Sequence, residues 1–395
     1  MRLLHTSDWH LGRQFHGASL LEEQAAAMDR IVELAAAAEV DAVLIAGDLY
    51  DRAIPPAEAV QLFNDTLARL RQSGAAVVAI AGNHDSHVRV SIYDPLLANF
   101  GVTVRGDVGR AHEPVLVRPR HGGEAVAIYP LPYLEPSVDG PALAQGDEAG
   151  DAAAPPRLRH EEVTRLALAR IHGHRQQHAG QRAVLVAHTF AAGGEGCESE
   201  RELTVGNVDR VSVETFAGFD YVALGHLHGS QELAGPRLAY SGTPLAYSFS
   251  EQHQRKSVRL VELAADGAVS VELLPLEVGR PLRTLDGELE ELLRNPGHRQ
   301  AEAARLRVIL RDEALPLQAM ARLRQRFPHV AELRHQPPAL EHSSTGDRSN
   351  RVRQARSALE LTAAFFSDQQ GRAASEAEAA LLREALMAAA GGGER

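Results

Sequence analysis

The strongest constraint on the fold is an alternation of short β-rich runs with helical stretches along roughly the first 275 residues. The β-rich runs are apolar and lie at 2–5, 42–46, 76–81, 125–129, 183–188 and 221–225. Amphipathic or alanine-rich stretches, such as 21–38 and 57–71, separate the early runs. This alternation predicts an α/β sheet with both faces covered. Two later runs, 236–242 and 256–263, are more typical of an antiparallel second sheet.

Polar side chains follow five of these runs directly. In α/β sheets, functional residues gather in the loops just beyond the carboxyl ends of the strands. A glycine precedes the polar residue in three of the five places, which permits a sharp turn or a close backbone approach. The residues at these ends are Asp8, His10, Asp48, Asn83, His84, Asp85, His188, His226 and His228.

The side-chain types in this set suit a divalent cation. Asp8 and His10, like His226 and His228, are separated by one residue, and in an extended backbone such pairs project to the same side. Carboxylate, imidazole and amide ligands without thiolate suit manganese, with iron, zinc and magnesium as alternatives. An aspartate can also bridge two ions about 4 Å apart, as in two-metal phosphoryl transfer. One such motif alone is more often a turn, but five at five successive strand ends indicate a metal site.

The ordered set DxH, GD, GNHD, H and GHxH resembles the calcineurin-like metallophosphoesterases. Within that group the stretches TSDWHLGR, AGDLYDRAIPP, AGNHDS, YPLPYLEP, GHLH and YSGTPLAYSFSE are similar to the SbcD family of bacterial nuclease subunits. The likeness runs to about residue 280 and continues more loosely to the C-terminus. It implies an α/β fold, a sandwich of two mixed sheets flanked by helices, followed by a small α+β capping domain and a C-terminal helical pair.

The resemblance also implies a role for each residue at the strand ends. Asp8, His10 and His228 would hold a first ion, and Asp48 would bridge to a second. Asn83, His188 and His226 would complete the second site. His84 would face the scissile phosphate as a catalytic residue, and Asp85 would orient His84 through a hydrogen bond.

Two further residues, Asp51 and Trp9, lie beside the expected ligands in the sequence. Archaeal and eukaryotic relatives carry a histidine three residues after the bridging aspartate, whereas this chain has Asp51, so that histidine's role does not transfer. Trp9 lies between two expected ligands and should point away from the ions, as a packing or substrate-contact residue.

Composition and pattern divide the chain further. We expect a metallophosphoesterase nuclease domain at 1–278, with a surface insertion at 137–158 that is rich in Gly, Ala, Pro and acidic residues. A strand pattern and then a helix pattern predict an α+β module at 279–335, which by resemblance is a DNA-capping domain. A linker at 336–351 and a helical partner-binding segment at 352–395 follow.

An arginine excess marks part of the α+β module. Residues 299–334 hold eight arginines and four acidic residues, a local charge of +4 (8 − 4), inside a chain of formal net charge −11. A solvated helical face and a phosphate-contacting surface are both consistent with this excess. The overall acidity argues against a protein that coats DNA without regard to sequence.

The C-terminal segment predicts two helices over 355–390. The second opens with Ser375 and Glu378 at the spacing of a capping box. The expected partner-binding stripe consists of Leu361, Phe365, Phe366, Leu382 and Leu386. This stripe either packs on the chain's own body or, by resemblance, grips the SbcC-like ATPase subunit.

A homodimer is a further implication of the resemblance, because the helices after the GD and GNHD motifs form the dimer bundle in SbcD-like proteins. The stretches concerned are 57–71 and 94–100, whose apolar residues are Val60, Phe63, Leu67, Leu70, Leu96, Leu97 and Phe100. The same residues could instead face the sheet.

The metal-ligand pattern and the resemblance together predict a two-metal-dependent DNA nuclease subunit. By resemblance it is a double-strand exonuclease and single-strand endonuclease that works with an SbcC-like ATPase on DNA ends and hairpins during DNA repair, replication and recombination. A generic metallophosphoesterase for small phosphomonoesters or phosphodiesters is the alternative, but such an enzyme needs neither a capping module nor a helix pair. The sequence contains no Walker A motif, so ATP hydrolysis would come from the partner.

Cysteine usage and hydropathy bear on the compartment. The single cysteine, Cys197, excludes an intramolecular disulfide and fits a reducing environment. No apolar run approaches the roughly 18 residues needed to span a bilayer. We therefore expect a cytoplasmic protein without a membrane partner.

Overall fold

The computed structural model describes residues 1–144, 158–200, 210–338, 358–370 and 372–391. They belong to two compact units, Met1–Leu282 and Arg283–Arg395. Each unit has a hydrophobic core of its own.

The first unit contains two six-stranded mixed sheets. The first sheet has the order β16-β15-β1-β4-β5-β6. Its strands β1, β4, β5 and β6 run parallel, whereas β15 pairs antiparallel with β1 and with β16. The strand bounds are β1 Arg2–Thr6, β4 Ala42–Ile45, β5 Ala76–Ile80, β6 Val102–Arg105, β15 Ser257–Leu263 and β16 Val269–Pro275.

The second sheet has the order β13-β14-β12-β9-β8-β7. Strands β8, β9, β12 and β14 run parallel, and the edge strands β7 and β13 pair antiparallel. The strand bounds are β7 Val115–Val117, β8 Val126–Leu131, β9 Ala183–His188, β12 Tyr221–Gly225, β13 Gln231–Glu232 and β14 Leu238–Tyr240. The predicted sandwich of two mixed sheets is therefore confirmed.

The expectation of a separate antiparallel sheet from the runs 236–242 and 256–263 is wrong. The first run forms β14, which lies parallel to β12, and the second forms β15, which lies in the other sheet. Strand patterns show that a segment pairs but not with which partner, because the partner is far away in the sequence.

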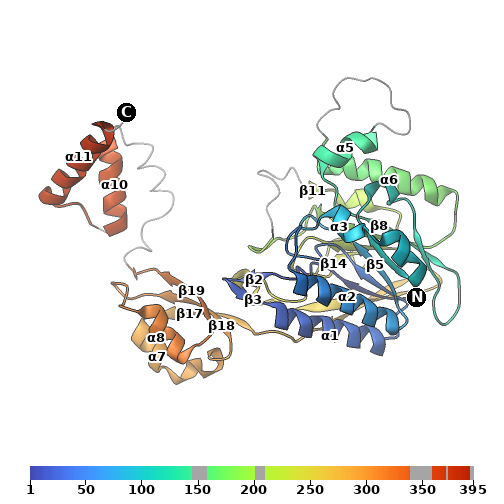
Figure 1. Ribbon diagram of the computed structural model, residues 1–395, viewed down its shortest axis with the longest axis horizontal. Coiled ribbons are helices and arrows are strands. Elements are labelled where there is room, and N and C mark those ends of the chain that lie inside the picture. The colour runs from blue at the N-terminus through green and yellow to red at the C-terminus, as the bar shows by residue number, and fades with distance from the viewer. Residues whose placement is uncertain (145–157, 201–209, 339–357, 371, 392–395) are drawn as a thin grey trace. The chain divides into compact units, whose positions relative to one another are not determined.

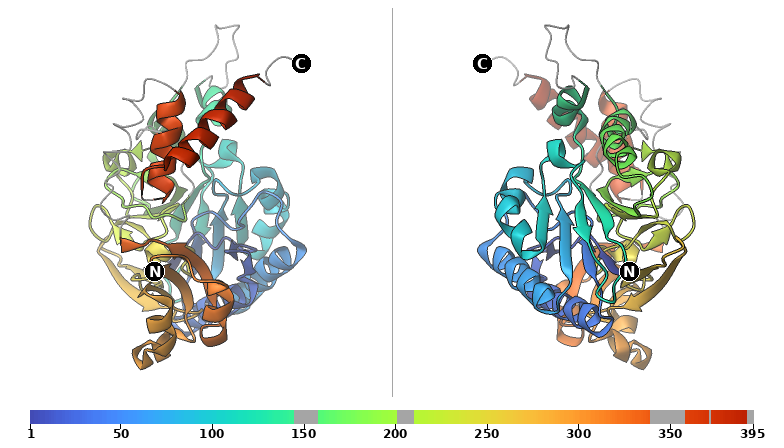
Figure 2. Two further views of the ribbon diagram at one scale, coloured as in Figure 1. Left: turned by 90° about the vertical axis from the view of Figure 1, so that its left-hand side faces the viewer. Right: turned by 90° about the vertical axis from the view of Figure 1, so that its right-hand side faces the viewer.

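The core of the sandwich lies between the two sheets. Leu3, Leu44 and Val78 of the first sheet pack against Ile128 and Val184 of the second, and all five are buried. Helices α1 (Leu21–Ala37) and α2 (Ala57–Gln72) lie side by side along the first sheet, and α6 (His160–Gln176) packs on the second (Figures 1 and 2). The two sheets and their helices thus form layers, as expected from alternating β and α segments.

Shorter elements connect these layers. They are β2 Gln14–Phe15, β3 Ala18–Ser19, α3 His87–Ser91, α4 Asp94–Leu97, η1 Ala98–Phe100, η2 Val108–Arg110, α5 Pro136–Ala144, β10 Phe190–Ala191, β11 Arg210–Val211, η3 Val213–Phe216 and η4 Phe249–Glu251. Helix α5 forms the start of the predicted surface insertion. This helix buries Leu143 and accepts a hydrogen bond from Arg170 of α6. Residues 145–157 of that insertion lie outside the described residues.

The two stretches proposed for a dimer differ in their exposure. In α2, Phe63, Leu67 and Leu70 are buried, so this helix faces the sheet. Leu96 and Phe100 are exposed, at 64% and 73% of their surface. Only the second stretch therefore offers an apolar surface to a partner.

The second unit opens with an α+β module. Its elements are β17 Leu282–Gly287, α7 Leu289–Arg294, η5 Pro296–Ala301, β18 Arg305–Leu310, α8 Ala319–Arg326 and β19 Val330–His335. The sheet order is β17-β18-β19, with β18 and β19 parallel, and α7 and α8 bury Leu289, Leu292 and Leu323 in the module core. The helix pattern stops at Arg326 and the chain resumes as β19 after Pro328, because proline cannot continue a helix.

Most arginines of the excess at 299–334 bond to groups within the module. Arg307 pairs with Glu332 at 2.7 Å, Arg311 pairs with Asp286, and Arg322 pairs with Glu290. Arg326 donates to the carbonyl oxygens of Leu292, Leu293 and Asn295 at 2.8–3.0 Å. The arginines thus hold this small module together, which favours the structural interpretation of the excess over a phosphate-contacting surface.

The C-terminal helices α10 (Ala358–Gln370) and α11 (Glu376–Gly391) pack against each other. Ser375 and Glu378 form the predicted capping box, since the Ser375 amide donates to Glu378 at 2.8 Å and the Glu378 amide donates to Ser375 Oγ at 3.4 Å. The predicted linker lies mostly outside the described residues, from 339 onward. Within the described part of the chain, no helix combines the length and the apolar character that a membrane crossing requires.

Candidate metal centre

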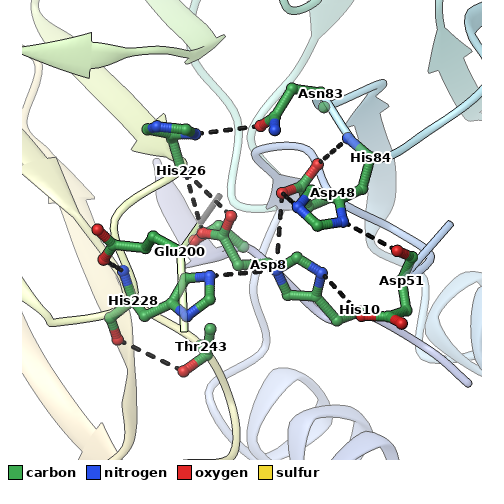
Figure 3. Close-up of polar contacts among 12 residues, drawn as sticks. Asp8, His10, Asp48, Asp51, Asn83, His84, Glu200, His226, His228 and Thr243 are labelled. Atoms are coloured by element: carbon green, nitrogen blue, oxygen red, sulfur yellow. Dashed lines mark hydrogen bonds and ion pairs between the residues drawn. The ribbon is translucent and has the colours of Figure 1, made fainter. Parts of the chain in front are cut away.

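The polar side chains at the five strand ends converge on one place, and Figure 3 labels those that follow β1, β4, β5 and β12. Strands β1, β4 and β5 of the first sheet and β9 and β12 of the second all end there. The sheets approach closely at this edge: a Cβ added to Gly225, the last residue of β12, would lie 1.7 Å from the carbonyl oxygen of Ala46, which follows β4. Glycine is needed here because any side chain would push the two sheets apart.

One group of donors combines the first and last motifs of the set. Ligand atoms of Asp8, His10 and His228 lie within 4.8 Å of one another, and all three residues are buried. The two imidazoles approach to 3.2 Å between their Nε2 atoms, and His10 Nε2 lies 3.6 Å from Asp48 Oδ2. Asp48 therefore stands beside this group, as the bridging role requires.

A second group lies on the other side of Asp48. His188 Nε2 is 2.8 Å from Asn83 Oδ1 and 3.5 Å from Asp48 Oδ2, and His226 Nδ1 is 3.1 Å from the same amide oxygen. The structure thus brings all seven predicted ligands together. Asp8 also has more potential neighbours at the site than predicted, because it forms a second group of donors with Asp48 and His188.

The glycines before Asp48 and Asn83 are required by close packing. A Cβ on Gly47 would lie 2.2 Å from His188 Nδ1, and a Cβ on Gly82 would lie 2.2 Å from the backbone nitrogen of Asp48. Real Cβ atoms essentially never approach other atoms below 3.0 Å. The neighbouring backbones can come this close only because these positions carry no side chain.

Four of the seven predicted ligands have a left-handed or otherwise strained backbone. The φ angles are 53° at Asp8, 44° at His10, 47° at Asp48 and 107° at His226. Such conformations cost about 1–3 kcal/mol each in a residue with a Cβ, and they cluster at functional sites. The expectation that Asp8 and His10 converge through an extended backbone is therefore wrong, because both residues turn sharply. Backbone hydrogen bonds from Asp8 to Gly47 (3.0 Å) and from His10 to Asp48 (2.9 Å) hold the turn.

His84 and Asp85 have different surroundings from those expected. His84 Nδ1 donates to the carbonyl oxygen of Asp51 at 2.9 Å, and its Nε2 faces Asp48 Oδ2 at 4.0 Å. The Asp85 carboxylate accepts from the backbone amides of Leu49, Tyr50 and Gly82 at 2.8–3.0 Å. The prediction that Asp85 orients His84 by a hydrogen bond is therefore wrong. Asp85 instead ties the GNHD loop to the loop of Asp48, and the backbone of Asp51 orients His84.

Burial controls the protonation of these groups. It lowers the pKa of His226 to about 3 and also lowers the pKa of His10, His188 and His228, so the imidazoles are neutral. Burial and then the charge of Asp48 raise the pKa of Asp8, and the same two causes raise the pKa of Asp85 to about 7.

The donors fit a divalent cation. His188 Nδ1–H donates a hydrogen bond to the Ala46 carbonyl oxygen at 2.9 Å, which leaves a lone pair on Nε2 facing the Asn83 and Asp48 oxygens. Acceptors that face one another at these distances repel, and a cation between them reverses the sign of the interaction. Neutral imidazole and ionised carboxylate are also the ligating forms of these groups.

Other predicted and unpredicted residues surround this group. Trp9 is fully buried, donates to Thr6 Oγ1 at 2.9 Å and packs edge-on against Phe63, so it is a packing residue. Ser199 and Glu200 contact His228 but were not predicted. Their stretch, GCESE, has no periodic or motif signal that points to the site.

Comparisons with known proteins agree with this geometry. Residues 1–230 match the family described as calcineurin-like phosphoesterase, and residues 278–370 match the family described as type 5 capsule protein repressor C-terminal domain. The chain is 32% identical over 303 residues to the SbcD component of the SbcCD nuclease of Escherichia coli (strain K12), a match that covers 74% of this chain and 72% of that protein.

Two further relatives carry the same name. The SbcD component of the SbcCD nuclease of Bacillus subtilis (strain 168) is 36% identical over 287 residues, or 71% of each chain. That of Staphylococcus saprophyticus is 30% identical over 337 residues, or 85% of each chain. The family match over residues 1–230 includes every residue of the metal centre, and the matches to the three relatives cover 71–85% of each chain. The chain therefore belongs to the SbcD family of calcineurin-like phosphoesterases.

Proposed function

We propose that this chain is the nuclease subunit of an SbcC–SbcD-type complex and hydrolyses DNA with two divalent metal ions. The observation that carries the proposal is the convergence of seven candidate ligand side chains, six of them buried, from five strand ends on one place. Relatives named as nuclease subunits share most of the chain. The reaction would serve double-strand exonuclease and single-strand endonuclease activity at ends and hairpins, in a cytoplasmic protein of DNA repair, replication and recombination.

In this proposal Asp8, His10 and His228 hold one ion, and Asn83, His188 and His226 hold the other. Asp48, which lies 3.6 Å from His10 and 3.5 Å from His188, belongs to both sites. Manganese suits this donor set best. A bound metal pair activates water and stabilises the charge of the phosphate in the transition state.

His84 is the proposed catalytic side chain. Its Nδ1–H donates to the Asp51 carbonyl oxygen, so its Nε2 faces the metal centre. When Nε2 is protonated as well, this atom can give its proton to the leaving oxygen. His84 is only half-buried, which leaves it accessible to a phosphate group. Asp85 contributes by accepting hydrogen bonds that hold the Asp48 loop and the GNHD loop together.

A direct test incubates the purified full-length chain with linear duplex and single-stranded DNA, with and without Mn²⁺. We expect Mn²⁺-dependent cleavage of DNA by the wild-type chain and no cleavage by Asp48→Ala. A chromogenic phosphodiester assayed in parallel measures the intrinsic hydrolytic activity. Hydrolysis of the small ester without any cleavage of DNA, with or without the ATPase partner, would instead support a generic phosphoesterase.

We further propose that the C-terminal helix pair binds the SbcC-like ATPase. Leu361 and Phe365 lie one helical turn apart on α10 and are 43% and 65% exposed. The other members of the predicted stripe, Phe366, Leu382 and Leu386, are half-buried, so the free apolar surface is smaller than predicted. Leu381 on α11, which is 65% exposed, adds to it.

The helix-pair proposal is tested with Phe365→Glu and the matched control Ala363→Glu, which puts the same charge on an exposed position off the stripe. Burying an unpaired carboxylate costs several kcal/mol, so Phe365→Glu should abolish co-purification with the ATPase. Its melting temperature should equal that of the control because the side chain is exposed in the isolated chain. A Phe365→Glu chain that still binds the ATPase would refute the proposal.

A homodimer is proposed through the surface of α3, α4 and η1. Five apolar residues within 13 positions are exposed there: Val88, Ile92, Tyr93, Leu96 and Phe100. Large exposed apolar patches mark interaction sites, and these five residues lie close together along the chain. Light scattering should give a dimer for the wild-type chain and a monomer for Ile92→Asp. Leu116→Asp, at an exposed apolar position on β7, is the control and should remain dimeric.

A further inference from the structure

Residues 197–200 form a short loop that contacts both the backbone and the ring of His228. The Glu200 carboxylate accepts the backbone amide of His228 at 2.8 Å (Figure 3). Ser199 Oγ lies 2.6 Å from Nδ1 of the His228 ring, on the side away from the metal centre. His228 is thus held at both its backbone and its ring by residues that are distant in the sequence.

The hydroxyl of Ser199 has a second strong partner. Its oxygen lies 2.6 Å from Glu251 Oε1, and both residues are buried. A carboxylate accepts hydrogen bonds but does not donate them, so the Ser199 proton points toward Glu251. The Ser199 oxygen therefore accepts from His228, and Nδ1 of His228 must carry the proton.

Glu251 is itself held as an acceptor. Its Oε1 also accepts from the backbone amide of Tyr247 at 3.1 Å and from Ser248 Oγ at 3.0 Å. Its Oε2 pairs with the Lys256 ammonium group at 2.5 Å. Lys256 in turn donates to the His228 carbonyl oxygen at 3.0 Å, which closes the network on the same residue.

These hydrogen bonds have a direction that reaches the metal centre. Lys256 fixes Glu251, Glu251 accepts a hydrogen bond from the Ser199 hydroxyl, and Ser199 Oγ accepts a hydrogen bond from Nδ1–H of His228. A neutral imidazole that is protonated on Nδ1 has its lone pair on Nε2, and this atom faces the site, 3.2 Å from His10 Nε2. The opposite tautomer would place a proton where the ligand lone pair is needed.

We propose that Ser199 and Glu251 are positioning residues that fix the Nε2 ligating tautomer of His228 and thereby set the affinity of the Asp8–His10–His228 site for a divalent cation. This inference rests on the proposed two-metal function. Partners that fix a ligating histidine from behind typically change metal affinity about 10–100-fold. Ser199 and Glu251 therefore affect one of the two ion sites, and the Asn83–His188–His226 site keeps its affinity.

The test uses the full-length chain with Ser199→Ala. The control is Ser250→Ala, since the exposed Ser250 accepts the Glu198 amide of the same loop but does not touch His228. Calorimetric titration with Mn²⁺ should show one site weakened about 10–100-fold in Ser199→Ala and two wild-type affinities in Ser250→Ala. Glu251→Gln, which removes the charge but keeps the shape, should weaken the same site.

A second measurement identifies the tautomer of His228 and requires neither bound metal nor catalytic activity. In the metal-free chain labelled with ¹⁵N-histidine, the His228 nitrogens should show the Nδ1–H pattern, with the signals assigned by their loss in His228→Gln. Ser199→Ala should shift them toward the Nε2–H pattern or a mixture, whereas Ser250→Ala should leave them unchanged.

The outcomes separate this inference from the proposed function. Two Mn²⁺ sites of unchanged affinity in Ser199→Ala, or an Nε2–H pattern in the wild-type chain, would overturn the role of Ser199 alone. A wild-type chain that binds no Mn²⁺ would overturn the two-metal function, and with it the role of Ser199 in metal affinity.

Discussion

Gly82→Ala should disable the metal centre without any change to a ligand. The added Cβ would lie 2.2 Å from both the backbone nitrogen and Oδ1 of Asp48, whereas ordinary contacts begin at 3.4 Å. The two loops must therefore move apart by about 1.2 Å (3.4 − 2.2). This movement would strain the bonds from Gly82 to Asp85 (2.8 Å) and from His84 to Asp48 (2.9 Å).

The expected effects follow from that displacement. Overpacking of a well-packed site typically costs about 1–3 kcal/mol of stability. A catalytic group misplaced by about 1 Å can lose roughly 100-fold in rate. We therefore expect a folded chain with weakened Mn²⁺ binding and hydrolysis of a chromogenic phosphodiester reduced by about two orders of magnitude.

The assay compares Gly82→Ala with Gly173→Ala in melting temperature, Mn²⁺ titration and turnover. Gly173 lies in α6, where an added Cβ meets nothing within 4 Å, so this control should keep full activity and gain up to about 1 kcal/mol of stability. Wild-type Mn²⁺ affinity and turnover in Gly82→Ala would refute the reasoning that close loop packing positions Asp48.

Three further outcomes are expected. Asp48→Ala should lose both ions in elemental analysis and essentially all hydrolysis, and a variant that keeps both ions would contradict the bridging role. His84→Ala should keep both ions and bind DNA but lose about 10²–10⁴-fold in turnover, and a loss of metal content would make His84 a ligand instead. Burial first, and then Arg259, lowers the pKa of His5 to about 3 from its usual 6.5, so the unfolded state binds more protons between these values and stability falls as the pH falls. Unfolding free energies at pH 7 and pH 5 should differ by about 2 kcal/mol less in His5→Gln than in the wild-type chain, and equal differences would contradict this prediction.

Much of the fold could be predicted because its signals are local. The apolar runs at 42–46 and 183–188 became β4 and β9 with nearly the same bounds, since buried parallel strands are continuous apolar runs. The strands with which β14 and β15 pair could not be predicted. These partners depend on which sheet edge is free when the chain returns to the sandwich.

The metal centre likewise has features that could be predicted from the sequence and features that could not. Asp8, Asp48 and His188 were predicted because ligand chemistry is written in residue type and strand ends share one edge of a sheet. The left-handed backbone of Asp8 and His10 was not predicted, because it arises from the pairing of their loop with the loop of Asp48.

The sequence by itself determined which atoms can bind a cation and at which strand ends they lie, since both follow from residue type and local periodicity. Tertiary structure alone decided that Asp85 ties two loops together, that Asp51 orients His84, and that the 197–200 loop closes over His228. The physical reason is that such contacts join segments up to 52 residues apart, such as Ser199 and Glu251, and only the packing of the whole sandwich brings them together.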